Sequence, residues 1–81
     1  MIKSVQVYTA GCPRSVVTAA FLEQAVKEMG IDIEVENIDD ADIRREHGVA
    51  VTPTIRINGD IKIEGKTCDI DCCKKFLTEY L

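Results

Sequence analysis

Two segments near the start of the chain alternate apolar and polar residues, and a helical pattern separates them. Positions 2–8 alternate as in a strand, with Val5 and Val7 on one side. Pro13 suits the first position of a helix, and the helical spacing continues over 14–29 until Gly30 ends it. The apolar face expected for this helix consists of Val17, Phe21, Leu22, Ala25, Val26 and Met29. Positions 31–38 alternate again, so the first part of the chain predicts a βαβ unit with parallel strands and a right-handed crossover.

The second half of the chain predicts a short helix, a hairpin and a final helix. Asp39 and Asp40 precede a helix over 41–47, which Gly48 ends. Strands over 54–57 and 61–64 flank the turn signal Asn58-Gly59. Asp69 stands where it can cap a helix over 70–81. The order βαβαββα predicts one mixed sheet between helices, an α/β fold in a single domain over 1–81.

Size and charge exclude several classes of protein. The 81 residues suffice for one domain, and the formal net charge of -4 provides no basic surface for nucleic acid or an anionic membrane. The chain has no apolar run long enough to cross a bilayer and no signal-peptide core at residues 1–11. We therefore expect a cytoplasmic monomer.

The four cysteines point to redox or metal chemistry rather than to a disulfide framework, because we expect a reducing compartment. Cys12 lies between a strand end and a helix start, where unpaired N–H groups and the helix dipole favour a thiolate. Arg14 adds a positive charge, and the Ser15 hydroxyl is close enough in sequence to reach the sulfur. A structural alternative, a small buried thiol, is disfavoured by this position.

Three motifs together resemble the thioredoxin and glutaredoxin superfamily, in particular its members of about eighty residues. They are Gly11-Cys12-Pro13-Arg14-Ser15, His47-Gly48-Val49-Ala50-Val51-Thr52-Pro53-Thr54, and Ile57-Asn58-Gly59-Asp60 followed by Gly65 and Cys68-Asp69. The resemblance implies a four-stranded sheet in the order 4-3-1-2 with helices on both faces. It also implies a cis Thr52–Pro53 bond facing Cys12, and a substrate surface that includes Pro13, Arg14, Thr52, Pro53 and Asp69.

The resembled activity is thiol–disulfide exchange, but Ser15 stands where the family has its second cysteine. A serine cannot resolve a mixed disulfide on Cys12, so three interpretations remain open. Glutathione or another external thiol resolves it, a distal cysteine does so, or Ser15 is an engineered replacement of a cysteine. Cys68 is the first choice among the distal thiols, because in the resembled fold its loop approaches the active-site cysteine.

The other distal cysteines have their own alternatives. Cys72 falls in the first turn of the last helix and could pair with Cys68, four residues earlier. Cys73 falls on the apolar stripe and is interpreted as core. Asp69 is a candidate ligand for the amino group of glutathione and equally a helix cap.

We interpret the chain as a thiol–disulfide oxidoreductase with Cys12 as nucleophile. Its partners would be a disulfide-containing protein or small thiol and a reductase or thiol donor. We expect no cofactor, unless glutathione serves as one. Two alternatives remain: a thiolate module for a metal ion or iron–sulfur cluster, and a redox-inactive protein that binds a partner.

Overall fold

The computed structural model describes residues 2–81, and its elements follow the predicted order. They are β1 (Val5–Tyr8), α1 (Pro13–Glu28), β2 (Val35–Ile38), α2 (Ala41–Glu46), β3 (Thr54–Ile57), β4 (Asp60–Glu64) and α3 (Ile70–Thr78). The strand order is β2-β1-β3-β4. β1 and β2 are parallel, and the other neighbouring pairs are antiparallel. The predicted mixed sheet and its order are therefore confirmed.

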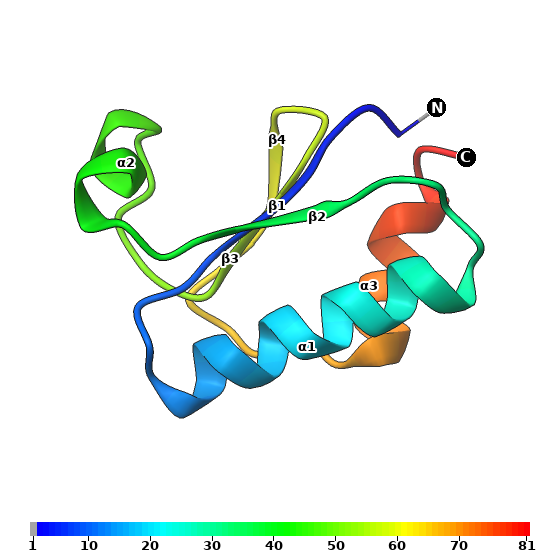
Figure 1. Cartoon of the computed structure of the whole chain (residues 1–81), viewed down its shortest axis with the longest axis horizontal. Coiled ribbons are helices and arrows are strands. Elements are labelled where there is room, and N and C mark those ends of the chain that lie inside the picture. Colours follow the sequence, from blue (N-terminus) through cyan, green and yellow to red (C-terminus); the bar gives the residue numbers. More distant parts are fainter. Residues whose placement is uncertain (1) are drawn as a thin grey trace.

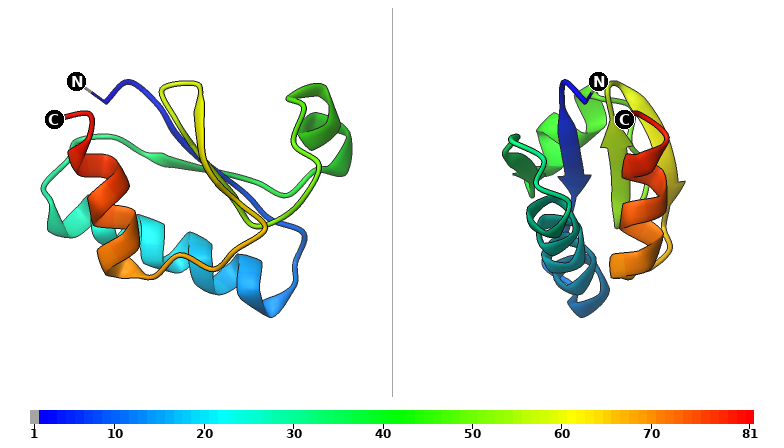
Figure 2. Two further views of the ribbon diagram at one scale, coloured as in Figure 1. Left: turned by 180° about the vertical axis from the view of Figure 1, so that it is seen from behind. Right: turned by 90° about the vertical axis from the view of Figure 1, so that its right-hand side faces the viewer.

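Helices cover both faces of the sheet. α1 and α3 lie side by side against one face, while α2 lies on the opposite side at one end (Figures 1 and 2). The larger core lies under α1 and α3, and alternate β1 residues Val5 and Val7 enter it. Tyr8 points to the opposite face, where it forms a smaller core with Ile38 and Val49. Within residues 2–81, no helix combines the length and the apolar character that a membrane span needs.

β1 and β2 are shorter than predicted, and both begin later along the chain than the alternating pattern does. The backbone N–H groups of Lys3 and Ser4 bond to the side-chain Oδ1 of Asn58, at 2.6 and 3.1 Å. β1 therefore begins at Val5, and β2 pairs with it only from Val35 onward. Of the predicted strand over 31–38, only the second half, Val35–Ile38, is a strand.

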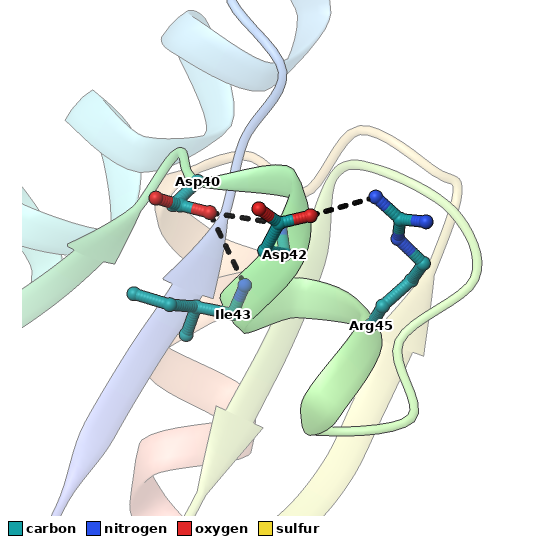
Figure 3. A network of polar contacts seen from close by, with 4 residues as sticks. All are labelled: Asp40, Asp42, Ile43 and Arg45. Carbon is teal, nitrogen blue, oxygen red and sulfur yellow. Dashed lines mark hydrogen bonds and ion pairs between the residues drawn. The ribbon is translucent and has the colours of Figure 1, made fainter.

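The local signals at turns and helix starts hold. Asn58 and Gly59 form the hairpin turn with φ of 52° and 85°, as a two-residue turn of this kind requires. Asp40 caps α2 by accepting hydrogen bonds from the N–H groups of Asp42 and Ile43, and Asp42 pairs with Arg45 (Figure 3). α2 ends at Glu46 rather than at residue 47, and α3 ends at Thr78 rather than at residue 81, so both helices are shorter than predicted.

The buried face of α1 agrees with the prediction at five of its six positions, since all but Val17 lie in the core or pack against it. Val17, expected in the core, is 42% exposed, whereas Ser15 and Thr18 are fully buried. The buried positions of α1 are Ser15, Thr18, Ala19, Leu22, Ala25 and Val26. Small residues in the first half of this face leave room for the segment before α3, whose Cys68 N–H reaches the Thr18 hydroxyl at 3.4 Å. The prediction for Val17 was wrong because it followed apolar character rather than close packing between helices.

Candidate functional site

The loops that carry the predicted site residues meet at one edge of the sheet. Tyr8, the last residue of β1, pairs with Ile38 at the end of β2 and with Thr54 at the start of β3. Thr54 in turn pairs with Glu64 at the end of β4. The segment leading to Cys12, the segment ending at Pro53 and the segment after Glu64 therefore leave or enter the sheet at the same edge. This register brings the first and second motifs together although about forty residues separate them.

Cys12 occupies the N-cap position of α1. Its backbone is extended, with φ of -78° and ψ of 155°, and its side chain makes no capping hydrogen bond. Pro13 takes the first helical position, where the missing N–H leaves no intrahelical bond unmade. The Cys12 sulfur lies 3.0 Å from the hydroxyl oxygen of Ser15, one turn further along the helix. Cys12 is partly exposed and Ser15 is buried, so the hydroxyl meets the sulfur from its protein side.

The surroundings of Cys12 favour its thiolate. The hydrogen bond from the Ser15 side chain is the largest cause that lowers the pKa of the Cys12 thiol, followed by the Ser15 backbone N–H. Desolvation opposes them, and the positive charge of Arg14 adds a further lowering effect. Since the thiolate is the reactive form of cysteine, the site is suited to nucleophilic attack on sulfur. Arg14 and Pro13 are exposed beside it.

The segment before β3 carries the predicted cis peptide bond between Thr52 and Pro53. Pro53 is buried, and its carbonyl accepts a hydrogen bond of 2.7 Å from the Gly65 N–H. The Thr54 hydroxyl donates to the Val51 carbonyl at 2.8 Å. These bonds fix the loop from both sides. Thr52 is partly exposed, and no intrachain hydrogen bond to its backbone is recorded within the described residues.

The three cysteines near the C-terminus, Cys68, Cys72 and Cys73, differ in their bonding. Cys68 and Cys72 form a disulfide across a Cα–Cα distance of 5.4 Å, one of the pairings that the sequence left open. Cys12 and Cys73 are free, and Cys73 is fully buried, as its place on the apolar stripe predicted. No group of three or more His, Cys, Asp or Glu side chains arranged to hold a metal ion is found over 2–81.

Asp69 is engaged in its own helix. It is the N-cap of α3, and its carboxylate accepts a hydrogen bond of 2.8 Å from the Cys72 N–H. Of the two roles open for Asp69, the structural one is observed. Its exposure leaves the carboxylate accessible from solvent as well.

A polar contact near this edge escaped the sequence interpretation. The hydroxyl of the buried Tyr8 lies 2.8 Å from Nδ1 of His47, and Arg56 donates to the same oxygen at 3.3 Å. His47, the last residue of the predicted helix over 41–47, is the C-cap of α2, and Arg56 lies in β3. The alternation of side chains along the strands could have predicted the contact between Tyr8 and Arg56. Arg56 pairs with Gln6, and Tyr8 is two residues further along β1, so both side chains lie on the same face of the sheet.

Comparison with known proteins places these features in one family. The profile of the thioredoxin domain matches residues 3–78. A thioredoxin of Methanothermobacter thermautotrophicus is 34% identical over 74 residues, which cover 91% of this chain and 96% of that protein. A thioredoxin of Methanocaldococcus jannaschii is 32% identical over 77 residues, covering 95% of this chain and 88% of its own length. With a thioredoxin-like strand order and matches over nearly its whole length, the chain belongs to the thioredoxin family of thiol–disulfide oxidoreductases.

Proposed function

We propose that the protein exchanges thiols and disulfides through a single nucleophile, Cys12, with Ser15 as the hydrogen-bond donor to its thiolate. The observation that carries this proposal is the 3.0 Å contact between the two side chains at the start of α1. A buried hydroxyl held against the sulfur donates to the charged form of the thiol and stabilises it. The helix N-terminus acts in the same direction.

The first step forms one S–S bond and breaks another. The Cys12 thiolate attacks a sulfur of the substrate disulfide, and the second substrate sulfur leaves as a thiolate. Cys12 then holds one half of the substrate as a mixed disulfide. A second thiolate must attack that bond to release the product and to restore Cys12.

We assign this second attack to an external thiol. Ser15 has no sulfur, and Cys68 is fully buried and bonded to Cys72. The Cys68 N–H lies at Thr18, six residues along α1 from Cys12, which is roughly 9 Å of helix. A disulfide normally needs Cα atoms within about 7 Å. Cys68 could resolve Cys12 only after its own disulfide is reduced and its segment shifts.

The surface around Cys12 suits an extended peptide or a small thiol. Val16 and Val51 are exposed at 55% and 46%, one at the start of α1 and one in the loop before Pro53. The backbone of Thr52 has no partner recorded within the described part of the chain, so it can pair with a substrate segment. The expected partners are a disulfide-containing protein or glutathione disulfide, with a reduced thiol or a reductase as the electron donor.

The test is mixed-disulfide formation with glutathione disulfide at pH 7. We expect one glutathionyl group on the intact chain, mapped to Cys12 by peptide mass and released by excess reduced glutathione. A Cys12→Ser variant provides the matched control and should stay unmodified over the time in which the wild-type chain reacts. The proposal is wrong if the wild-type chain reacts no faster than a free cysteine peptide at the same pH. A bond from Cys12 to Cys68 under these conditions would transfer the resolving step to the chain itself.

A further inference from the structure

The mechanism above leaves three cysteines unused, and they gather at the N-terminal end of α3. The Cys73 sulfur lies 3.5 Å from the Cys68 sulfur, which is already bonded to Cys72. The Cys73 sulfur also lies 3.7 Å from the Cys68 carbonyl oxygen. A free thiol is therefore held against one end of a disulfide within the same chain.

We propose that Cys68, Cys72 and Cys73 form a second thiol–disulfide exchange site, in which Cys73 displaces Cys72 from Cys68. The Cys73 thiolate attacks the Cys68 sulfur, a Cys68–Cys73 bond forms, the Cys68–Cys72 bond breaks, and Cys72 leaves as a thiolate. The proton given up by Cys73 is taken by solvent and returned to Cys72. No electrons are gained or lost overall, so the step needs no oxidant or reductant.

The distances allow this exchange with small movements. A disulfide bond is about 2 Å long, so the sulfurs of Cys73 and Cys68 must approach by about 1.5 Å. A rotation of the Cys73 side chain can supply a movement of this size. Both cysteines are fully buried, so the product disulfide stays inside the core.

The consequence of the exchange is a reactive thiol at the surface. Cys72 is partly exposed and lies in the first turn of α3, where the helix dipole favours a thiolate. The acidic residues at the start of α3 are Asp69, its N-cap, and Asp71 in its first turn. Lys74, further along α3, forms an ion pair with Glu28 of α1. In the observed pairing the free thiol is buried, whereas in the exchanged pairing it can reach small thiols and electrophiles.

Exchange is slow at neutral pH, because the attacking thiol is protonated. Burial raises the pKa of the Cys73 thiol to about 12, and the negative charge of Asp69 adds to the effect. Cys73 itself belongs to the larger apolar core. The thiolate fraction, and with it the exchange rate, should rise about 100-fold between pH 7 and pH 9.

The test uses a Cys12→Ser chain, which removes the other nucleophile, with excess iodoacetamide and no reductant at pH 7 and pH 9. Quenched samples are digested, and tandem mass spectrometry locates the label and the disulfide. We expect label on Cys72 together with a Cys68–Cys73 bond, formed much faster at pH 9 and at a rate independent of protein concentration. Circular dichroism verifies that the chain stays folded.

A chain carrying Cys12→Ser and Cys73→Ala is the matched control. It has the Cys68–Cys72 disulfide but no internal attacking thiol, so Cys72 should remain unlabelled. Label on Cys72 in this control would overturn the proposal, because the disulfide would then open without Cys73. Label on Cys73 alone, or no label at either position at pH 9 in the Cys12→Ser chain, would overturn it as well.

Discussion

The hydroxyl oxygen of the buried Ser15 lies 3.0 Å from the sulfur of Cys12. Ser15 stands where the resembled motif has a second cysteine. It donates a hydrogen bond that favours the Cys12 thiolate, but it cannot take over the sulfur of a mixed disulfide. The proposed function therefore uses this site for attack and needs another thiol for release.

Replacing Ser15 by alanine should raise the pKa of Cys12, because the largest cause of its lowering is removed. A lowered thiol pKa means that the thiolate is present at lower pH. The rate of alkylation by iodoacetamide should therefore reach its plateau at a higher pH in Ser15→Ala and fall several-fold at pH 7. The exposed neighbour Val16→Ala is the control, with an unchanged pH profile. Identical profiles for wild type and Ser15→Ala would contradict the assigned role.

Replacing Ser15 by cysteine should restore a dithiol site. The Cys12 sulfur and the Ser15 hydroxyl oxygen are 3.0 Å apart, so two sulfurs at these positions would need to approach by about 1 Å to form a disulfide. Glutathione disulfide should then oxidise Cys12 and the new thiol to an internal disulfide, and release of the substrate should no longer depend on the external thiol concentration. Peptide mapping and the concentration dependence of turnover check this. A glutathione adduct that persists on Cys12 would show that the geometry does not permit closure.

Asp69 offers a test of helix capping against ligand binding. Asp69→Ala removes the acceptor for the Cys72 N–H and should lower the free energy of unfolding by about 1 kcal/mol. Asp69→Asn keeps a capping oxygen and should retain most of the stability. Urea unfolding measures both effects. If Asp69→Asn instead keeps its stability but loses glutathione reactivity at Cys12, the carboxylate charge also contacts the ligand.

The contact between Tyr8 and His47 should contribute to stability. Tyr8→Phe removes a buried hydroxyl that contacts Nδ1 at 2.8 Å, at a cost of about 1 kcal/mol. A double-mutant cycle with His47→Ala isolates the coupling between the two side chains. Tyr80→Phe is a useful comparison, because the Tyr80 hydroxyl bonds to the exposed Asp60 at 2.9 Å and should matter less. Additive effects of the Tyr8 and His47 changes would mean that the contact contributes nothing.

The sequence by itself determined the order of the elements and the place of Cys12 at the start of a helix. Pro13, Asp40, Asp69 and the Asn58-Gly59 turn act within a few residues of themselves, so their effects are visible in the local pattern. The order of elements then restricted the sheet to few arrangements. Cys12 was identified for the same reason, since a helix N-terminus is a local feature.

Only the tertiary structure decided the contacts between distant segments. Val17 points outward because close packing at Thr18 and Cys68 set the rotation of α1, not the apolar character of its residues. The segment before α3 enters the core, and its path decides which cysteines pair. The same path places Cys73 against Cys68. These contacts follow from the simultaneous fit of several elements, and a periodic pattern along one element carries no information about the rotation or approach of its neighbour.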